Sequence, residues 1–208
     1  MKRFIVAITR TCGSGATSIG ELLSKEYGIE MYDKNILRLA SDDSGINEQL
    51  FAMADENVKK SLLYKISKKV YKGELIPPES DDFTRNDNLF NYQAKVLKEL
   101  AEQESYVCIG RACDYVLRDN PNAVKIFLYA PFEVCVAKEM KRLGIGKREA
   151  EKHVSNTDKH RREYHKYHTG RTWGDPYNYD MCLDTSKFES YQDCVDYIKF
   201  YLDKRFAD

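Results

Sequence analysis

The fold is decided by residues 4–20, which read FIVAITRTCGSGATSIG. The apolar run Phe4–Ile8 is typical of a buried strand. A turn at residues 13–15, Gly-Ser-Gly, leads into a helical pattern over Ala16–Tyr27. A strand, a glycine turn and a helix N-terminus together direct backbone N–H groups and the positive end of a helix dipole toward one point. The stretch therefore predicts an anion site, and phosphate is the expected ligand.

Two phosphate-binding patterns fit this turn, each incompletely. In the dinucleotide pattern G-x-G-x-x-G, Ser18 replaces the third glycine and Glu30 is a passable ribose-binding acid. In the P-loop pattern G-x-x-x-x-G-K-[ST], Arg10 stands at the first glycine and Ala16 at the lysine. We favour the P-loop, with the hydroxyls of Thr17 or Ser18 available for Mg²⁺. A dinucleotide loop and an ordinary strand-to-helix turn remain open alternatives.

Composition narrows the class of protein. The 208 residues include 33 Lys and Arg against 33 Asp and Glu, so the net charge is about zero and does not indicate a nucleic-acid or acidic-membrane partner. We find no apolar run approaching the roughly 20 residues of a membrane span. The first six residues resemble the start of a signal peptide. Their apolar run is short and enters the glycine turn directly, so we expect it to be a strand of the mature protein.

The six cysteines are scattered and form no C-x-x-C pair. They are best explained as reduced thiols that act as small hydrophobic residues, which predicts a cytoplasmic protein. The same spacing argues against a disulfide framework or a zinc site. The pair His165 and His168 has no further ligands at a suitable spacing, so we assign it no metal. The cysteines are residues 12, 108, 113, 135, 182 and 194.

Short apolar runs alternate with longer helical patterns, which predicts a parallel sheet covered by helices on both faces. Such sheets bind ligands at the carboxyl ends of their strands. The expected strands are Phe4–Ile8, Glu30–Tyr32, Tyr106–Ile109, Val124–Tyr129 and Met181–Leu183. The expected helices are Ala16–Tyr27, Lys34–Ala40, Ile46–Tyr71, Asn86–Gln103, Pro131–Leu143, Lys147–His168 and Tyr191–Phe206. We predict one domain over residues 1–208, with insertions at about 33–104 and about 144–178.

Polar residues follow several of these strands. Asp33 follows the second strand, as a helix N-cap or as a contact to substrate or Mg²⁺. Arg111 follows Gly110 after the third strand and offers a planar fork to a phosphate. Asp184 and Thr185 follow the last strand, where a cap for the next segment is the alternative to a ligand contact.

The segment 147–171 is rich in Lys, Arg and His. On a helix, Asp158, Arg161, Arg162 and His165 share one broad face. A solvated charged helix would explain this pattern. The alternative is a mobile cationic lid that closes on transferring phosphates.

Taken together, these features resemble the cytidylate kinase-like family of P-loop proteins, within the nucleoside monophosphate kinases. The resemblance covers most of the chain and depends on the order and spacing of several short motifs. These are Ile8-Thr9-Arg10 before Gly13-Ser14-Gly15, Tyr32-Asp33-Lys34, Gly110-Arg111, Asp158 with Arg161 and Tyr164, Thr169-Gly170, Trp173-Gly174, and Tyr179-Asp180 with Asp184-Thr185.

The resemblance implies an α/β fold of three layers, with a five-stranded parallel sheet, a helical monophosphate-binding insertion and an arginine lid. It implies transfer of the γ-phosphoryl group of ATP, with Mg²⁺, to a small-molecule nucleoside monophosphate. Gly13, Ser14, Gly15, Ala16, Thr17 and Ser18 would then hold the donor phosphates, and Asp184 and Thr185 would lie near the donor base. Asp33, Arg111 and Asp114 would face the acceptor, while Arg161, Arg162 and Arg171 would be the lid cations.

The chain departs from true cytidylate kinases at two positions. Ala16 stands where the phosphate-loop lysine is expected, and the acid after Gly110-Arg111 comes at Asp114 rather than immediately. Because phosphoryl transfer depends on positioning and charge stabilisation, losing one fixed cation matters. We expect Arg10 to supply part of the missing charge. A protein that binds nucleotide or phosphate with little or no transfer is the alternative.

Overall fold

The computed structural model describes residues 2–33 and 82–207, which form an α/β fold around a five-stranded parallel sheet. The strand order is β2-β3-β1-β4-β5, and every pairing is parallel. The sheet confirms the predicted fold class. The strands are β1 Ile5–Arg10, β2 Glu30–Tyr32, β3 Tyr106–Ile109, β4 Ala123–Tyr129 and β5 Met181–Asp184.

The central strand β1 extends two residues beyond the apolar run that predicted it. Thr9 pairs with Phe127 and Arg10 with Leu128 of β4. Backbone pairing does not require an apolar side chain, so the polar residues continue the strand. This extension carries Arg10 to the carboxyl edge of the sheet, directly before the glycine turn.

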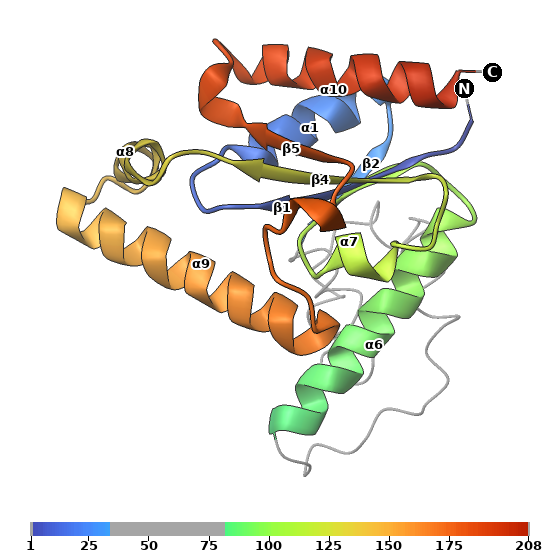
Figure 1. Ribbon diagram of the computed structural model, residues 1–208, viewed down its shortest axis with the longest axis horizontal. Helices are drawn as coiled ribbons and strands as arrows, with labels where there is room; N and C mark the ends of the chain where they lie inside the picture. The colour runs from blue at the N-terminus through green and yellow to red at the C-terminus, as the bar shows by residue number, and fades with distance from the viewer. Residues whose placement is uncertain (1, 34–81, 208) are drawn as a thin grey trace, which may run out of the picture.

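Helices cover both faces of the sheet. In Figure 1, α1 (Ala16–Tyr27) and α10 (Tyr191–Phe206) lie above it, while α6 (Asp82–Ala101) and α7 (Cys113–Val116) lie below. Side chains alternate along β1, so Val6 and Ile8 pack with α1 and α10, whereas Ile5 and Ala7 pack with α6 and α7. Two buried cores therefore sandwich the sheet.

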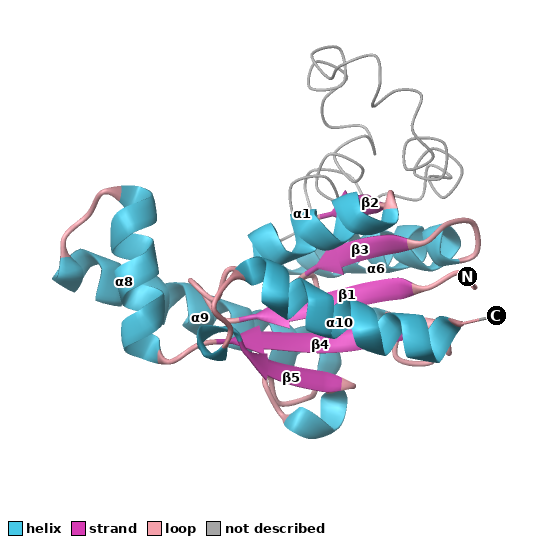
Figure 2. Ribbon diagram, turned by 90° about the horizontal axis from the view of Figure 1, so that it is seen from above, coloured by secondary structure: helices cyan, strands magenta, loops and turns pink. Residues whose placement is uncertain are grey.

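A helical pair stands at the carboxyl edge of the sheet. Figures 1 and 2 place α8 (Phe132–Leu143) beyond the end of β4, and α9 (Lys147–Thr169) runs back beneath the sheet. Val136 of α8 and Val154 of α9 share a small core with Cys12, the residue before the glycine turn. The far end of α9 meets α6, where the rings of His168 and Phe90 stack 4.3 Å apart.

Most predicted elements are confirmed to within a few residues. The helices predicted over Lys34–Ala40 and Ile46–Tyr71 lie outside the described residues. The four-residue helix α7 was not predicted, because it is too short to show a helical period.

All six cysteines are free, and only Cys182 is exposed. Burial is the largest cause that raises the pKa of Cys12 and of Cys194, each to about 11, so both are thiols at neutral pH. This agrees with their predicted role as small hydrophobic residues. Within residues 2–33 and 82–207, the helices are too short or too polar to span a bilayer.

Candidate phosphate-transfer site

The glycine turn after β1 requires glycine at both ends. Gly13 and Gly15 have φ angles of 76° and 83°, in the left-handed region that glycine adopts at little cost. A Cβ at Gly13 would lie 2.7 Å from the carbonyl oxygen of Cys135, and one at Gly15 would lie 2.4 Å from the ring of Tyr191. The turn is therefore packed tightly between α8 and the start of α10.

Ser14, between the two glycines, stabilises the turn through hydrogen bonds of its side chain and its backbone carbonyl. Its side chain is fully buried and its hydroxyl donates to the carbonyl of Thr11 at 2.9 Å. The hydroxyl of Thr185, which follows β5, donates to the carbonyl of Ser14 at 2.8 Å. These contacts fix the loop in front of the N-terminus of α1.

The N-terminus of α1 supplies the expected anion-binding amides. The helix begins at Ala16, and its first intrahelical bond runs from the N–H of Ile19 to the carbonyl of Gly15. The N–H groups of the first turn have no intrahelical acceptor and share the positive end of the helix dipole. Ala16 is buried, Ser18 is half-buried and Thr17 is exposed, so the two hydroxyls lie at the open side of this turn. Such oxygens suit Mg²⁺, which retains several waters when bound.

A pocket of about 400 Å³ opens beside this loop at the carboxyl ends of β1 and β3. One wall comes from the end of β1 and the turn after β3, and the other from α9. Its lining is rich in guanidinium and aromatic groups. The residues are Thr9, Arg10, Gly110, Arg111, Ala112, Thr157, His160, Arg161, Tyr164, His165 and Trp173.

Arg10 is a half-buried cation of the pocket, and loss of hydration dominates its electrostatics. Its guanidinium lies against Gly110, where a Cβ would approach Arg10 Nη1 to 2.1 Å. Burial, followed by the nearby charge of Arg161, lowers the pKa of Arg10 to about 10, while the charge of Asp33 opposes this shift. Arg10 is still protonated at neutral pH, and the pocket therefore holds a desolvated positive charge that an anion would stabilise.

Arg161 connects α9 to the start of the phosphate loop. Its Nη1 atom donates to the carbonyl of Arg10 at 3.2 Å and lies 3.4 Å from Asp158 Oδ1. The same Asp158 oxygen accepts from the backbone N–H of Cys12 at 2.7 Å. Burial raises the pKa of Asp158, although the Cys12 amide and Arg161 both oppose this. Asp158 and Arg161 thus hold the helix that carries the second guanidinium of the pocket.

Arg111 enters the pocket from a strained turn. Arg111 and Ala112 have φ angles of 55° and 51° and follow Gly110 at 80°. A left-handed conformation costs about 1–2 kcal/mol for each non-glycine residue. The Arg111 guanidinium lies 5.8 Å from the ring of Tyr164, and its Nε is buried without a hydrogen-bond partner. Arg111 therefore brings a third guanidinium to the pocket wall, and one buried donor of this group has no hydrogen-bond partner.

Asp33 and Asp114, which were both predicted to face the acceptor nucleotide, differ in their position relative to the pocket. Asp33 lies close enough for its charge to act on Arg10. Asp114, by contrast, is 1% exposed and does not line the pocket. Its Oδ1 accepts from the hydroxyl of Thr9 at 3.1 Å, and its Oδ2 lies 2.9 Å from His165 Nε2. Asp114 therefore holds two pocket residues, Thr9 and His165, in place without facing the pocket itself. It lies on α7, four positions after Gly110, where its side chain is buried.

Two predicted lid cations, Arg162 and Arg171, do not line the pocket in this conformation. The guanidinium of Arg162 lies 5.7 Å from the ring of Trp173, and that of Arg171 lies 5.2 Å from the ring of Tyr115. Of the three predicted lid arginines, Arg161 alone faces the cavity.

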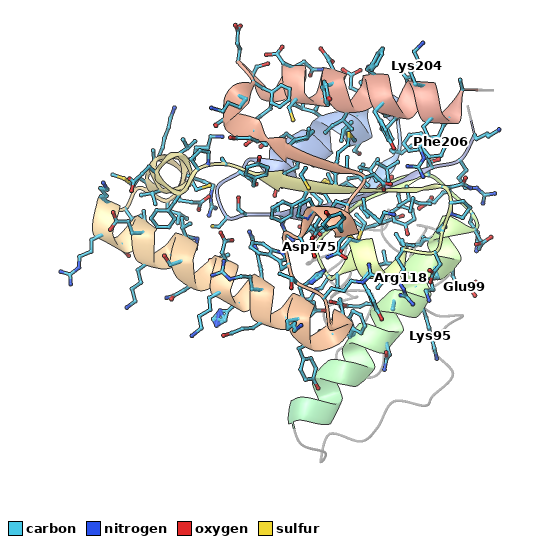
Figure 3. The ribbon with its side chains drawn as sticks, viewed as in Figure 1. Lys95, Glu99, Arg118, Asp175, Lys204 and Phe206 are labelled. Atoms are coloured by element: carbon cyan, nitrogen blue, oxygen red, sulfur yellow. The ribbon has the colours of Figure 1, made fainter. Side chains whose placement is uncertain are left out.

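Asp184, the last residue of β5, and Thr185, which follows it, both make structural contacts. Asp184 caps the short helix Thr185–Lys187 by accepting from the N–H and the hydroxyl of Ser186. Thr185 is buried and bonds to Ser14, as described above. The capping alternative that the sequence left open for Asp184 is thus present in the structure. Asp175, labelled in Figure 3, caps the preceding short helix Pro176–Asn178 in the same way.

Sequence patterns missed Lys138. It lies on α8, and its Nζ is 5.0 Å from the centroid of Tyr191, the ring that packs against Gly15. Cys135, one helical turn before Lys138, packs against Gly13. A cation therefore lies beside a phosphate loop that has no lysine of its own. No spacing rule could have found it, because α8 follows the loop by more than 100 residues.

A parallel sheet, a glycine turn before a helix N-terminus and an arginine-rich pocket together define the P-loop kinase class of proteins. Within that class, residues 5–187 match the cytidylate kinase-like family, and the chain belongs to this family.

Known relatives agree with that assignment. The chain is 25% identical over 187 residues to a cytidylate kinase of Methanopyrus kandleri, an alignment that covers 88% of this chain and 86% of the relative. An uncharacterized protein from Eubacterium ventriosum shares the fold with a TM-score of 0.70 and 24% identity, covering 97% of this chain and 99% of that one. Shikimate kinase from Bacteroides thetaiotaomicron has a TM-score of 0.51 and 13% identity, with 96% and 98% coverage. The last two comparisons show the fold alone.

Proposed function

We propose that this protein transfers the γ-phosphoryl group of ATP to a small-molecule nucleoside monophosphate, with a pyrimidine nucleotide as the preferred acceptor. The observation that carries the proposal is the pocket in which Arg10, Arg111 and Arg161 converge beside the phosphate loop. Three guanidinium groups that line a pocket of about 400 Å³ suit a compact dianion such as a phosphate monoester. The cytidylate kinase among the relatives supports the pyrimidine preference.

In the proposed reaction, an oxygen of the acceptor phosphate attacks the γ-phosphorus in line, and the bond to the β–γ bridging oxygen breaks. The products are a nucleoside diphosphate and ADP. The second ionisation of a phosphate monoester has a pKa near 6, so the attacking oxygen is already ionised at neutral pH and needs no general base. Thr17 and Ser18 would hold Mg²⁺, which neutralises charge on the donor phosphates when bound.

The first-turn amides of α1 would bind the donor phosphates, while Arg10 and Arg161 would stabilise charge that develops during transfer. Arg162 and Arg171 would contribute after closure of α9 and the segment that follows it. Thr185 bonds to the carbonyl of Ser14 in the loop, and we place the donor base near Thr185 and the adjacent Asp184. The free thiols support a cytoplasmic location for this chemistry.

The test is turnover of ATP with Mg²⁺ and a panel of CMP, UMP, AMP and GMP, with nucleoside diphosphate and ADP both quantified. We expect equal amounts of the two products with CMP or UMP. Arg161→Met should reduce kcat/KM by about 100-fold or more, because it removes a transition-state cation. Arg148→Met, an exposed change on the same helix, is the matched control.

ATP binding without product from any acceptor would refute the kinase assignment. It would support the alternative of a nucleotide- or phosphate-binding protein, in which Ala16 replaces the catalytic lysine. Because binding and turnover are measured on the same preparation, the two proposals are separated directly.

A further inference from the structure

We propose that Cys12, Glu139 and His153 form a zinc-binding site that joins the phosphate loop to α8 and α9. One ligand atom from each residue lies within 4.8 Å of the other two. The three residues lie on the segment after β1, on α8 and on α9. In the sequence, Cys12 is more than 100 positions from each of the other two. This inference does not depend on the proposed kinase activity.

The donor set matches the chemistry of zinc. Zn²⁺ binds thiolate sulfur, imidazole nitrogen and carboxylate oxygen in tetrahedral geometry, whereas Mg²⁺ prefers oxygen alone. On one tetrahedral zinc ion, such donors are about 3.3–3.6 Å apart, given bond lengths of 2.0–2.3 Å. His153 Nε2 lies 3.5 Å from Glu139 Oε2, so this pair already has the required separation.

The surroundings suit a partly buried ion. Cys12 and Glu139 are each 5% exposed, and the small core around Cys12 contains Val136 and Val154. His153 is 38% exposed, which leaves an open side for a water as the fourth ligand. Charge also balances, because one thiolate and one carboxylate together neutralise Zn²⁺.

Neighbouring groups would orient two of the ligands. Arg142 Nε donates to both oxygens of Glu139, at 3.2 and 3.0 Å, and fixes the plane of the carboxylate. The closest contact joins Arg142 Nη2 to Glu139 Oε2, at 2.5 Å, and this is the oxygen that faces His153. The Arg142 side chain is 61% exposed, so Nη2 would move toward solvent when the metal binds Oε2, while Nε keeps its hydrogen bond to Oε1. The side chain of Thr157 hydrogen bonds to Cys12. Such outer partners are typical of protein metal sites.

Binding would release the thiol proton of Cys12 to solvent as the sulfur–zinc bond forms, with no change in oxidation state. Because Cys12 directly precedes the glycine turn, the ion would hold α9 against the loop. This is the helix that lines the arginine pocket, so metal binding would fix one wall of that pocket.

The test uses Co²⁺ as a spectroscopic probe on the full-length, chelator-treated protein. We expect one saturable Co²⁺ site with a thiolate-to-cobalt charge-transfer band, displaced by Zn²⁺ and unaffected by excess Mg²⁺. Cys12→Ser should abolish the band, whereas Cys182→Ser, at the exposed cysteine, should retain it. His153→Ala should weaken Co²⁺ affinity at least tenfold, while His160→Gln on the same helix should leave it unchanged.

The half-exposed position of His153 keeps the test independent of folding, because its replacement leaves the buried core intact. Circular dichroism of each variant verifies that it is folded. A charge-transfer band that survives Cys12→Ser, or the absence of saturable Co²⁺ binding, would overturn the proposal. Equal affinity in wild type and folded His153→Ala would do the same.

Discussion

His165 Nε2 lies 2.9 Å from Asp114 Oδ2, and the two side chains are 3% and 1% exposed. The other Asp114 oxygen accepts from Thr9 of β1, and the hydroxyl of Thr169 donates to the carbonyl of His165. Thr169 also accepts from the N–H of Arg171, at 3.0 Å. The C-terminal end of α9 is therefore anchored to the central strand through one buried polar network.

We predict that Asp114→Ala lowers the free energy of unfolding by about 3–5 kcal/mol, because it leaves His165 and Thr9 buried without their partner. Urea unfolding followed by circular dichroism measures the change. Asp119→Ala, at a side chain that is 84% exposed, should stay within about 0.5 kcal/mol of wild type. Similar values for both variants would show that the network contributes little.

Gly110→Ala should weaken acceptor binding much more than ATP binding. Its Cβ would lie 2.1 Å from Arg10 Nη1, so the guanidinium must leave its place in the pocket. Isothermal titration with CMP and with ATP separates the two effects.

Gly144→Ala is the matched control for backbone strain. Gly144 also has a positive φ, 67°, but a Cβ there would meet nothing within 4 Å. Each substitution costs about 1–2 kcal/mol of left-handed strain. If the two variants bind CMP equally well, the contact between Gly110 and Arg10 has no role in the pocket.

Arg10→Met should stabilise the ligand-free protein while reducing phosphate binding. Burial and Arg161 lower the pKa of Arg10 to about 10 in the fold, below the ordinary arginine pKa of the unfolded chain, so the charged form is disfavoured in the fold. The unfolded chain binds more protons between these two pKa values, and wild-type stability therefore rises with pH through this window. At neutral pH Arg10 is charged in both the folded and the unfolded state, so the full free-energy cost of burying the charge is present. We expect removal of the charge to raise the free energy of unfolding by up to about 3 kcal/mol, since one pKa unit corresponds to about 1.4 kcal/mol.

Denaturant unfolding at neutral pH, combined with CMP titration, checks both parts of that prediction. Residues that lower the stability of the ligand-free protein are typical of functional sites. A less stable Arg10→Met variant with normal CMP affinity would instead assign Arg10 a packing role.

Lys138→Met should raise the dissociation constant for ATP about tenfold, since it removes the cation beside Tyr191 and the glycine turn. Lys141→Met lies three residues further along α8 and is exposed, so it should bind ATP as wild type does. Calorimetry with ATP measures both. Identical affinities would show that Lys138 does not compensate for the lysine that Ala16 replaces.

Sequence by itself determined the layers and the phosphate loop of this protein. Strand and helix periods are local, so β2, β3 and α1 begin and end where the pattern predicted. The glycines at 13 and 15 are also readable locally, because positive φ angles favour glycine.

Only the tertiary structure decided which polar groups meet. It turned Asp114 into the core, left Arg162 and Arg171 outside the pocket, and brought Lys138 to the phosphate loop. It also gathered Cys12, Glu139 and His153, although cysteine spacing had argued against zinc. The physical reason is that side-chain contacts between distant segments depend on strand order and helix packing, which local periodicity does not encode.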